Sequence, residues 1–182
     1  MPRPPRAQAP GIYHVTSRGN RRQDVFLTDG DRLRFLALLE TVYSKAEWIV
    51  HAYCLMPNHY HLVVEIDAPT LSSGLQSLNG DYAQTFNRRH RLVGHLFQGR
   101  FHSVRVETDP HLLELARYLP LNPVRARLCE EPADWPWSSY RATVGIIRPA
   151  PFLAVDRVLG LFGIDRRRAR QAFASFVAGP RL

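Results

Sequence analysis

The sequence has a single lysine and very little cysteine. Of its 24 basic residues only Lys45 is a lysine, so arginine carries the positive charge. The two cysteines, Cys54 and Cys129, are too few for a disulfide framework and lack the spacing of a zinc site, so we expect free thiols. No apolar run approaches the roughly 18 residues of a membrane span, and the first ten residues lack a signal-peptide core. We therefore expect no membrane contact and a cytoplasmic, nucleoid-associated protein.

What the chain does have is positive charge and enough apolar residues for a core. Its 182 residues, 45% of them hydrophobic, suit one domain with a short appendage. The net charge of +8 indicates a polyanionic partner, most simply nucleic acid. Arginine suits phosphate and base recognition through its planar fork of donors. An arginine bias can also come from a GC-rich coding sequence, so charge supports nucleic-acid binding without establishing it.

Apolar periodicity predicts an α+β fold. The order strand, helix, strand, strand, helix, strand, helix is the split βαβ pattern of ferredoxin-like and RRM-like folds, with a four-stranded antiparallel sheet and helices on one face. Asp29 or Asp31 is suited to cap the first helix, and Asp109 the third. The expected strands cover residues 11–17, 48–55, 59–66 and 100–107, and the expected helices cover 31–43, 71–91 and 111–119.

The same patterns suggest three parts of the chain. Residues 1–10 are rich in proline and arginine and are expected to be a disordered basic N-terminus. Residues 11–145 form the domain. Residues 146–182 are expected to be a linker followed by a small basic C-terminal helical appendage.

Two histidines stand two residues apart in the third predicted strand. His59 and His61 follow a Pro-Asn turn and point to one face of the strand, whereas Tyr60 and Leu62 point to the other. Two neighbouring imidazoles can supply two of the ligands of a metal site. By itself, His-x-His is more often found on a solvated or hydrogen-bonded strand face, so the motif needs support from the rest of the chain.

The third predicted helix supplies that support. Tyr118 and Asn122 face the same way if the helix continues for one more turn. A tyrosine beside a cation that polarises a phosphodiester can act as a covalent nucleophile, and an amide oxygen can bind Mg²⁺ or Mn²⁺. Pro120 lies between them and has no N–H to donate, which predicts that the helix ends or kinks near Tyr118. A core tyrosine and a turn asparagine are the structural alternatives.

Basic residues gather at three places where they could contact DNA. One group follows the first strand, one ends the second helix and one flanks the fourth strand. The helix dipole also favours cations at a helix C-terminus, so the basic group at the end of the second helix has a structural explanation of equal weight. The candidate DNA-binding residues are Arg18, Asn20, Arg21, Arg22, Arg88, Arg89, Arg100 and Arg105.

Taken together, five stretches of the sequence resemble the REP-associated tyrosine transposases, within the HUH single-tyrosine transposase superfamily. They appear in the family's order and span most of residues 11–145, which makes them far more specific than the histidine pair alone. The stretches are residues 13–20 (YHVTSRGN), 56–62 (MPNHYHL), 97–101 (FQGRF), 116–118 with 121–126 (ARY, LNPVRA) and 136–140 (PWSSY).

The resemblance implies roles for four residues. His59 and His61 would hold Mg²⁺ or Mn²⁺, Asn122 would be a third ligand, and Tyr118 would be the nucleophile. In such enzymes the tyrosine attacks single-stranded DNA near a hairpin, which leaves a 5′-phosphotyrosine and a free 3′-OH for strand joining. The implied partner is a hairpin of a repetitive extragenic palindrome (REP), bound by a monomer or homodimer. Pro120 departs from the family, because many relatives have histidine there.

Three functions are compatible with the sequence. The leading one is a metal-dependent single-stranded DNA endonuclease and strand transferase. The second is a domesticated protein that binds DNA hairpins without cutting them, with Pro120 as the disabling change. The third is a metal-dependent hydrolase that uses water, whose turnover would survive Tyr118→Phe. The target sequence, the preferred metal, the oligomeric state and the role of residues 146–182 are left open.

Overall fold

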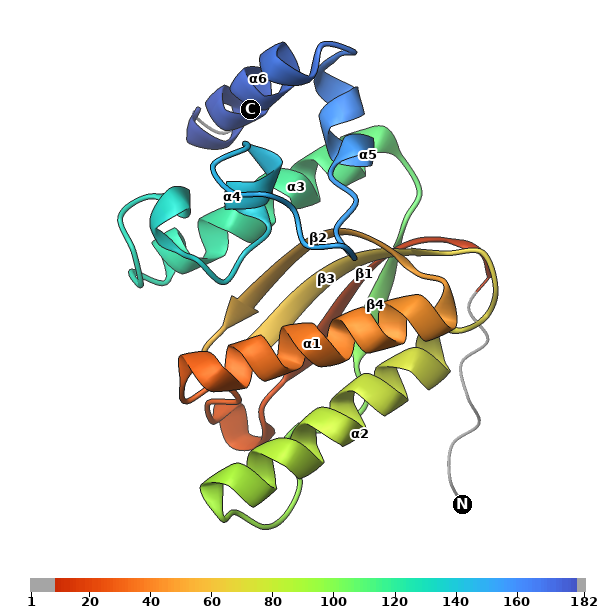
Figure 1. The fold of residues 1–182 in the computed structure, drawn as a ribbon, viewed down its shortest axis with the longest axis vertical. Coiled ribbons are helices and arrows are strands. Elements are labelled where there is room, and N and C mark those ends of the chain that lie inside the picture. The colour runs from red at the N-terminus through yellow and green to blue at the C-terminus, as the bar shows by residue number, and fades with distance from the viewer. Residues whose placement is uncertain (1–8, 180–182) are drawn as a thin grey trace.

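The centre of the molecule is a four-stranded antiparallel sheet with the strand order β2-β3-β1-β4 (Figure 1). The computed structural model describes residues 9–179, so most of the predicted disordered N-terminus lies outside the described residues. The pairing of β1 with both β3 and β4 confirms the split βαβ prediction. The strands are β1 (Gly11–Arg18), β2 (Ile49–Met56), β3 (His59–Ile66) and β4 (His102–Val106).

Two long helices, α1 (Asp29–Ala46) and α2 (Leu71–His90), cover one face of the sheet (Figure 1). Aromatic rings fill the space between them and the strands, with the centroid of Phe35 4.7 Å from Tyr60 and 5.2 Å from Tyr82. The helix α1 begins earlier than predicted. Its N-cap is Thr28, because the Thr28 hydroxyl accepts from the backbone of Asp31 while the Asp31 carboxylate accepts from the backbone of Thr28.

A third helix, α3 (Asp109–Arg125), packs on the opposite face of the sheet. Thr108, and not Asp109, is its N-cap, since the Thr108 hydroxyl accepts from the backbone N–H of His111 at 3.3 Å. The predicted end of the helix near Tyr118 is wrong, because α3 continues through Pro120 and on to Arg125. Leu112, Leu115 and Leu119 bury its apolar stripe against the sheet, and this burial offsets the cost of about 3 kcal/mol for an internal proline.

The chain after α3 returns along β2, which is an edge strand. The N–H of Leu55 donates to Trp137 O at 2.8 Å, and the N–H of Ala154 donates to Val50 O at 2.8 Å. These bonds cover much of an edge that would otherwise offer unpaired backbone groups to other chains. The remaining helices and helical turns are η1 (Asn20–Arg22), η2 (Pro132–Asp134), α4 (Tyr140–Thr143), α5 (Asp156–Leu159), η3 (Gly160–Phe162) and α6 (Arg166–Ala178).

The C-terminal helices belong to the main hydrophobic core. Val158 of α5 and Phe173 and Val177 of α6 are buried in the same cluster as the side chains beneath α1 and α2. Within residues 9–179 no helix combines the length and the apolar character needed to cross a membrane.

Candidate active site

The strand β3 presents two histidines to the face that α3 covers. Tyr60 and Leu62 point to the α1 and α2 face and are fully buried there. His59 and His61 point the other way, with their ring centroids 4.9 Å apart and their planes at 79°. His61 is only 5% exposed. His61 is therefore enclosed between the sheet and α3, whereas His59 at the start of the strand stays partly exposed.

Tyr118 of α3 lies directly against this pair. Its ring meets His61 edge to face, with centroids 5.7 Å apart and planes at 88°. The ring is half-buried and lines a cavity, so it is not closed within the core. The guanidinium carbon of Arg125 lies 5.5 Å from the Tyr118 ring centroid, within the range of a cation–π contact. The structure thus brings the predicted nucleophile to one of the two predicted ligands, His61.

Asn122 stands one helical turn after Tyr118. Since α3 is continuous across Pro120, the two side chains share a face of the helix. The amide nitrogen of Asn122 is buried and has no hydrogen-bond partner among residues 9–179. This unpaired group is a donor and calls for an acceptor such as a phosphate oxygen, whereas a metal ion would be bound by the amide oxygen of Asn122.

A third histidine, His14 of β1, was not predicted as part of the site. Its Nε2 lies 3.0 Å from Nδ1 of His61, and the two rings stack at 5.2 Å and 15°. The β1–β3 register pairs Thr16 with His61, which puts His14 diagonally beside His61 on one face. The sequence contains His14 within a family-like stretch, but only the strand register shows its proximity.

Burial keeps all three imidazoles neutral. Desolvation, with smaller contributions from His59, His14 and Arg18, lowers the pKa of His61 to about 2. Burial followed by the charge of Arg18 lowers the pKa of His59 to about 4. The pKa of His14 is also lowered to about 4, mainly by burial. A neutral imidazole is the form that binds a metal ion.

The donor atoms fit a divalent metal. Nδ1–H of His59 donates to Asn58 Oδ1 at 2.6 Å, which leaves its Nε2 for a ligand. Nε2 of His61 is buried and has no hydrogen-bond partner in the described part of the chain. No group of three His, Cys, Asp or Glu side chains within residues 9–179 could hold a metal. A site here would therefore use the histidine pair and an amide such as that of Asn122.

Several of the predicted DNA-binding residues lie at the same end of the sheet. Arg18 pairs with His59 across the β1–β3 register. The loop after α2 packs beside it, because the N–H of Gln98 donates to Arg18 O at 3.0 Å and the N–H of Asn20 to Leu96 O at 2.8 Å. Arg21 and Arg22 extend from η1 and are exposed. This end of the molecule therefore combines positive charge with the histidines. Arg100 is exposed and ends the same loop.

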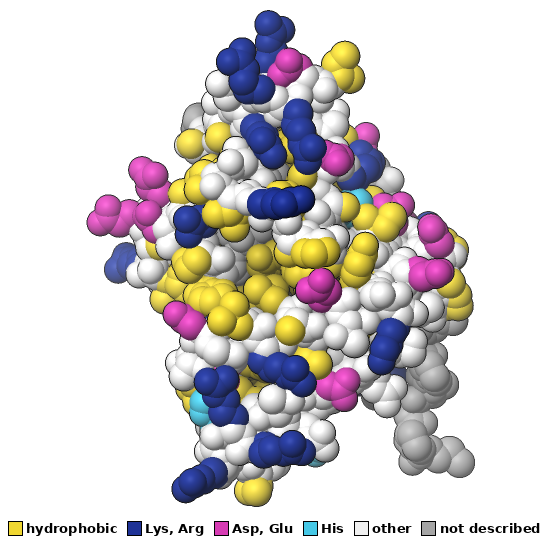
Figure 2. All heavy atoms as spheres, in the orientation of Figure 1, with side chains coloured by type: hydrophobic (Ala, Val, Ile, Leu, Met, Phe, Trp, Pro, Cys, Tyr) yellow, Lys and Arg dark blue, Asp and Glu magenta, His cyan; other side chains and the backbone are white. Residues whose placement is uncertain are grey.

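The other predicted basic residues are placed differently. Arg88 and Arg89 are exposed near the end of α2, where Figure 2 shows dark blue side chains gathered at the lower left. Arg89 also lies 3.8 Å from the carboxylate of Asp31. Arg105 pairs opposite Tyr13, on the face away from the histidines, and donates to Pro10 O at 3.0 Å. The structure does not bring Arg105 to the site.

Comparison with known proteins gives one family and a shared fold. The family described as "Transposase IS200 like" matches residues 8–121. A REP-associated tyrosine transposase, solved bound to a REP hairpin, is 18% identical with a TM-score of 0.65, over 86% of this chain and 90% of that chain. A putative transposase from Deinococcus radiodurans R1 is 17% identical with a TM-score of 0.46, over 65% and 95% of the two chains. Comparison with curated proteins finds no match.

Proposed function

Because the chain belongs to the IS200-like transposase family, we propose that it is a metal-dependent endonuclease and strand transferase for single-stranded DNA. The observation that carries the proposal is the edge-to-face contact of Tyr118 with His61, which puts a nucleophile next to paired neutral imidazoles. The proposed substrate is a DNA hairpin of the REP type. The shared fold with a REP-associated tyrosine transposase, which was solved bound to such a hairpin, supports this substrate class.

In the proposed reaction the phenolic oxygen of Tyr118 attacks the scissile phosphorus. A 5′-phosphotyrosine ester forms and the 3′ oxygen leaves as a free 3′-OH, so the ester retains the energy for a later strand joining. His59, His61 and Asn122 would hold Mg²⁺ or Mn²⁺, which supplies polarisation of a phosphate oxygen when bound. Arg125 beside the Tyr118 ring adds positive charge where the phosphate is attacked.

We propose that the basic end of β1 holds the DNA. Arg18 and the residues of η1 surround the edge of the site that is nearest to His59, and their exposed guanidinium groups suit phosphate contacts. Arg100 ends the loop that packs on Arg18 and extends this surface. The other proposed contacts, from Arg88, Arg89 and Arg105, lie further from the histidines.

Covalent capture of the DNA tests the function. End-labelled hairpins with varied single-stranded flanks are incubated with the protein and Mg²⁺ or Mn²⁺, and the products are separated on denaturing gels. We expect a labelled protein band that requires metal, disappears in Tyr118→Phe and persists in Tyr43→Phe, a control on α1. Hairpin binding without this band would support the domesticated binder, and turnover in Tyr118→Phe would support the water-using hydrolase.

The continuity of α3 weakens the case for a disabled binder. That hypothesis depended on Pro120 interrupting the helix between Tyr118 and Asn122. Both residues instead belong to one continuous helix, and Pro120 is buried within it. The proposed activity therefore does not require Pro120 to be replaced by histidine.

A further inference from the structure

A cavity of about 560 Å³ opens beside Tyr118, away from the stripe that α3 buries against the sheet. Leu113, Glu114 and Arg117 of α3 line it together with Tyr118 and Arg125. Phe176 of α6 closes the far side, and α6 lies outside the residues that match the transposase family. The cavity is therefore built jointly by the helix that carries the nucleophile and by the C-terminal helix.

Several contacts hold the cavity in shape. The guanidinium of Arg117 lies 5.3 Å from the Phe176 ring centroid and donates to the backbone oxygen of Gly179. The Phe176 ring also packs against Phe162, with centroids 5.5 Å apart. Phe176 nevertheless keeps part of its surface exposed, and so does Tyr118 at the other side. The Arg117 guanidinium thus covers one face of the Phe176 ring, and this stacked pair is fixed next to the proposed nucleophile.

We propose that this cavity binds one unpaired nucleobase of the DNA strand, next to the phosphate that Tyr118 attacks. Nucleobases stack on aromatic rings and on guanidinium planes, which Phe176 and Arg117 provide. The volume lies within the usual range for small-molecule sites. Arg125, which lies over the Tyr118 ring, also complements the charge of the phosphate next to a bound base. The inference rests on the proposed function and adds to it a position at which sequence is read.

Glu114 determines which base the cavity accepts. Its exposed carboxylate stands at the rim of the cavity and can only accept hydrogen bonds when ionised. Guanine offers a carboxylate two adjacent donors, its N1–H and its N2 amino group. Cytosine and adenine each offer one amino group beside a ring-nitrogen acceptor, and thymine offers only its N3–H between two carbonyl oxygens. The cavity therefore selects guanine over the other three bases.

A binding experiment in the Tyr118→Phe background tests this without requiring cleavage. Fluorescence anisotropy measures Kd for hairpins whose single-stranded flank carries each of the four bases at each position in turn. We expect one position at which guanine binds about fivefold more tightly than the other three bases. Glu114→Gln should remove most of that preference. Phe176→Leu should weaken binding of flanked hairpins about tenfold and leave hairpins without a flank unchanged.

Gln171→Ala is the control, because Gln171 is exposed on the same helix α6 and does not line the cavity. Base preferences that are unchanged in both Glu114→Gln and Phe176→Leu would overturn the proposal, as would an equal effect of Gln171→Ala. The covalent-capture gel is read separately. If no covalent adduct forms but the base preference still depends on Glu114, the proposed cleavage function is contradicted and the base-binding cavity is supported.

Discussion

One ring nitrogen of each candidate ligand histidine is already engaged by a neighbour. Nδ1 of His59 meets Asn58, and Nδ1 of His61 meets His14. When His61 donates in that contact, its Nε2 is left unprotonated and available. Neighbours of this kind orient the ring before a metal arrives, which lowers the cost of ordering the site on binding. At the scale of single residues, His14 is thus a positioning residue for His61.

We predict that His14→Ala weakens Mn²⁺ binding by about 10- to 100-fold, because His61 loses the partner that fixes its ring. Isothermal titration calorimetry measures the affinity directly and does not depend on cleavage. His95→Ala, which changes an exposed histidine of the loop after α2, is the control and should leave the affinity unchanged. Equal affinities for His14→Ala and the unaltered protein would mean that His14 only packs against its neighbour.

The residues of the site differ in how far the sequence alone predicts them. The alternation of a strand is local, so the shared face of His59 and His61 follows from their spacing. The position of His14 depends on the register between β1 and β3, which is set by pairing across 47 residues of chain. The contact of Arg125 with Tyr118 depends on α3 remaining helical through two prolines. Tertiary packing decides both of these.

At the scale of elements, the main differences from the sequence concern helix ends. Threonine and aspartate are both good N-caps, so composition alone does not choose between Thr28 and Asp31 or between Thr108 and Asp109. In each case the residue whose backbone is extended becomes the cap. The end of α3 was missed because the local penalty for Pro120 is outweighed by burial against the sheet. The strand order, by contrast, followed from the succession of elements.

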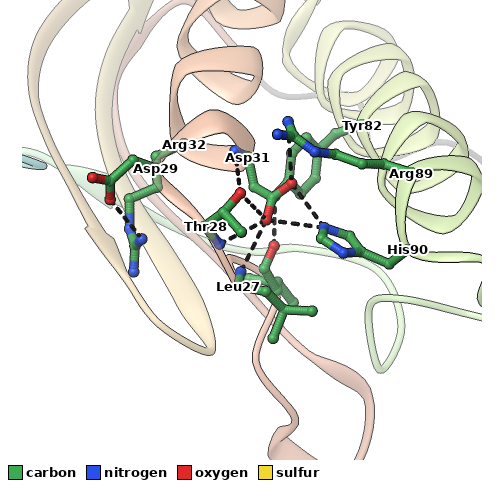
Figure 3. Close-up of polar contacts among 9 residues, drawn as sticks. Leu27, Thr28, Asp29, Asp31, Arg32, Tyr82, Arg89 and His90 are labelled. Atoms are coloured by element: carbon green, nitrogen blue, oxygen red, sulfur yellow. Dashed lines mark hydrogen bonds and ion pairs between the residues drawn. The ribbon is translucent and has the colours of Figure 1, made fainter.

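A buried carboxylate joins the start of α1 to the end of α2 (Figure 3). Asp31 is 2% exposed and accepts from the backbone N–H groups of Leu27 and Thr28. Its Oδ1 also lies 2.9 Å from Nε2 of His90 on α2. Burial alone would raise the pKa of Asp31, but the hydrogen bonds from His90 and Thr28 outweigh burial and lower it below 3.8. The ionised form therefore stabilises the fold.

We predict that Asp31→Asn lowers the free energy of unfolding by about 2 kcal/mol at pH 7. Because the pKa of Asp31 is lowered on folding, its ionised carboxylate stabilises the fold above pH 3.8, and this contribution is lost as the pH falls through the folded-state pKa. Urea denaturation at pH 7 and near pH 3 should therefore show a smaller difference in acid. Asp29→Asn, an exposed carboxylate of the same helical turn, is the control. If Asp31→Asn lowers the free energy of unfolding equally at both pH values, the proposed role of the ionised carboxylate is contradicted.

At the scale of the whole molecule, positive charge is spread widely but is concentrated near the site in one cluster. Figure 2 shows dark blue side chains over the end of α2 and over the C-terminal helices, with apolar surface between them. The net charge of +8 attracts DNA to every part of this surface. The cluster formed by Arg18, Arg21 and Arg22 lies at the end of β1 that pairs with His59. General attraction and specific contact should therefore depend differently on salt.

We predict that replacing Arg18, Arg21 and Arg22 together by alanine makes hairpin binding both weaker and less sensitive to salt. Each lost contact with a single-stranded phosphate reduces the slope of log Kd against log salt by about 0.7, so three contacts reduce it by about 2. Titrations of the Tyr118→Phe protein between low and high salt give this slope. Arg34→Ala, at an exposed position of α1, removes charge without touching the cluster and should leave the slope unchanged. If the triple variant keeps the slope of the parent protein, DNA is held by other arginines, and the basic end of β1 only steers it toward Tyr118.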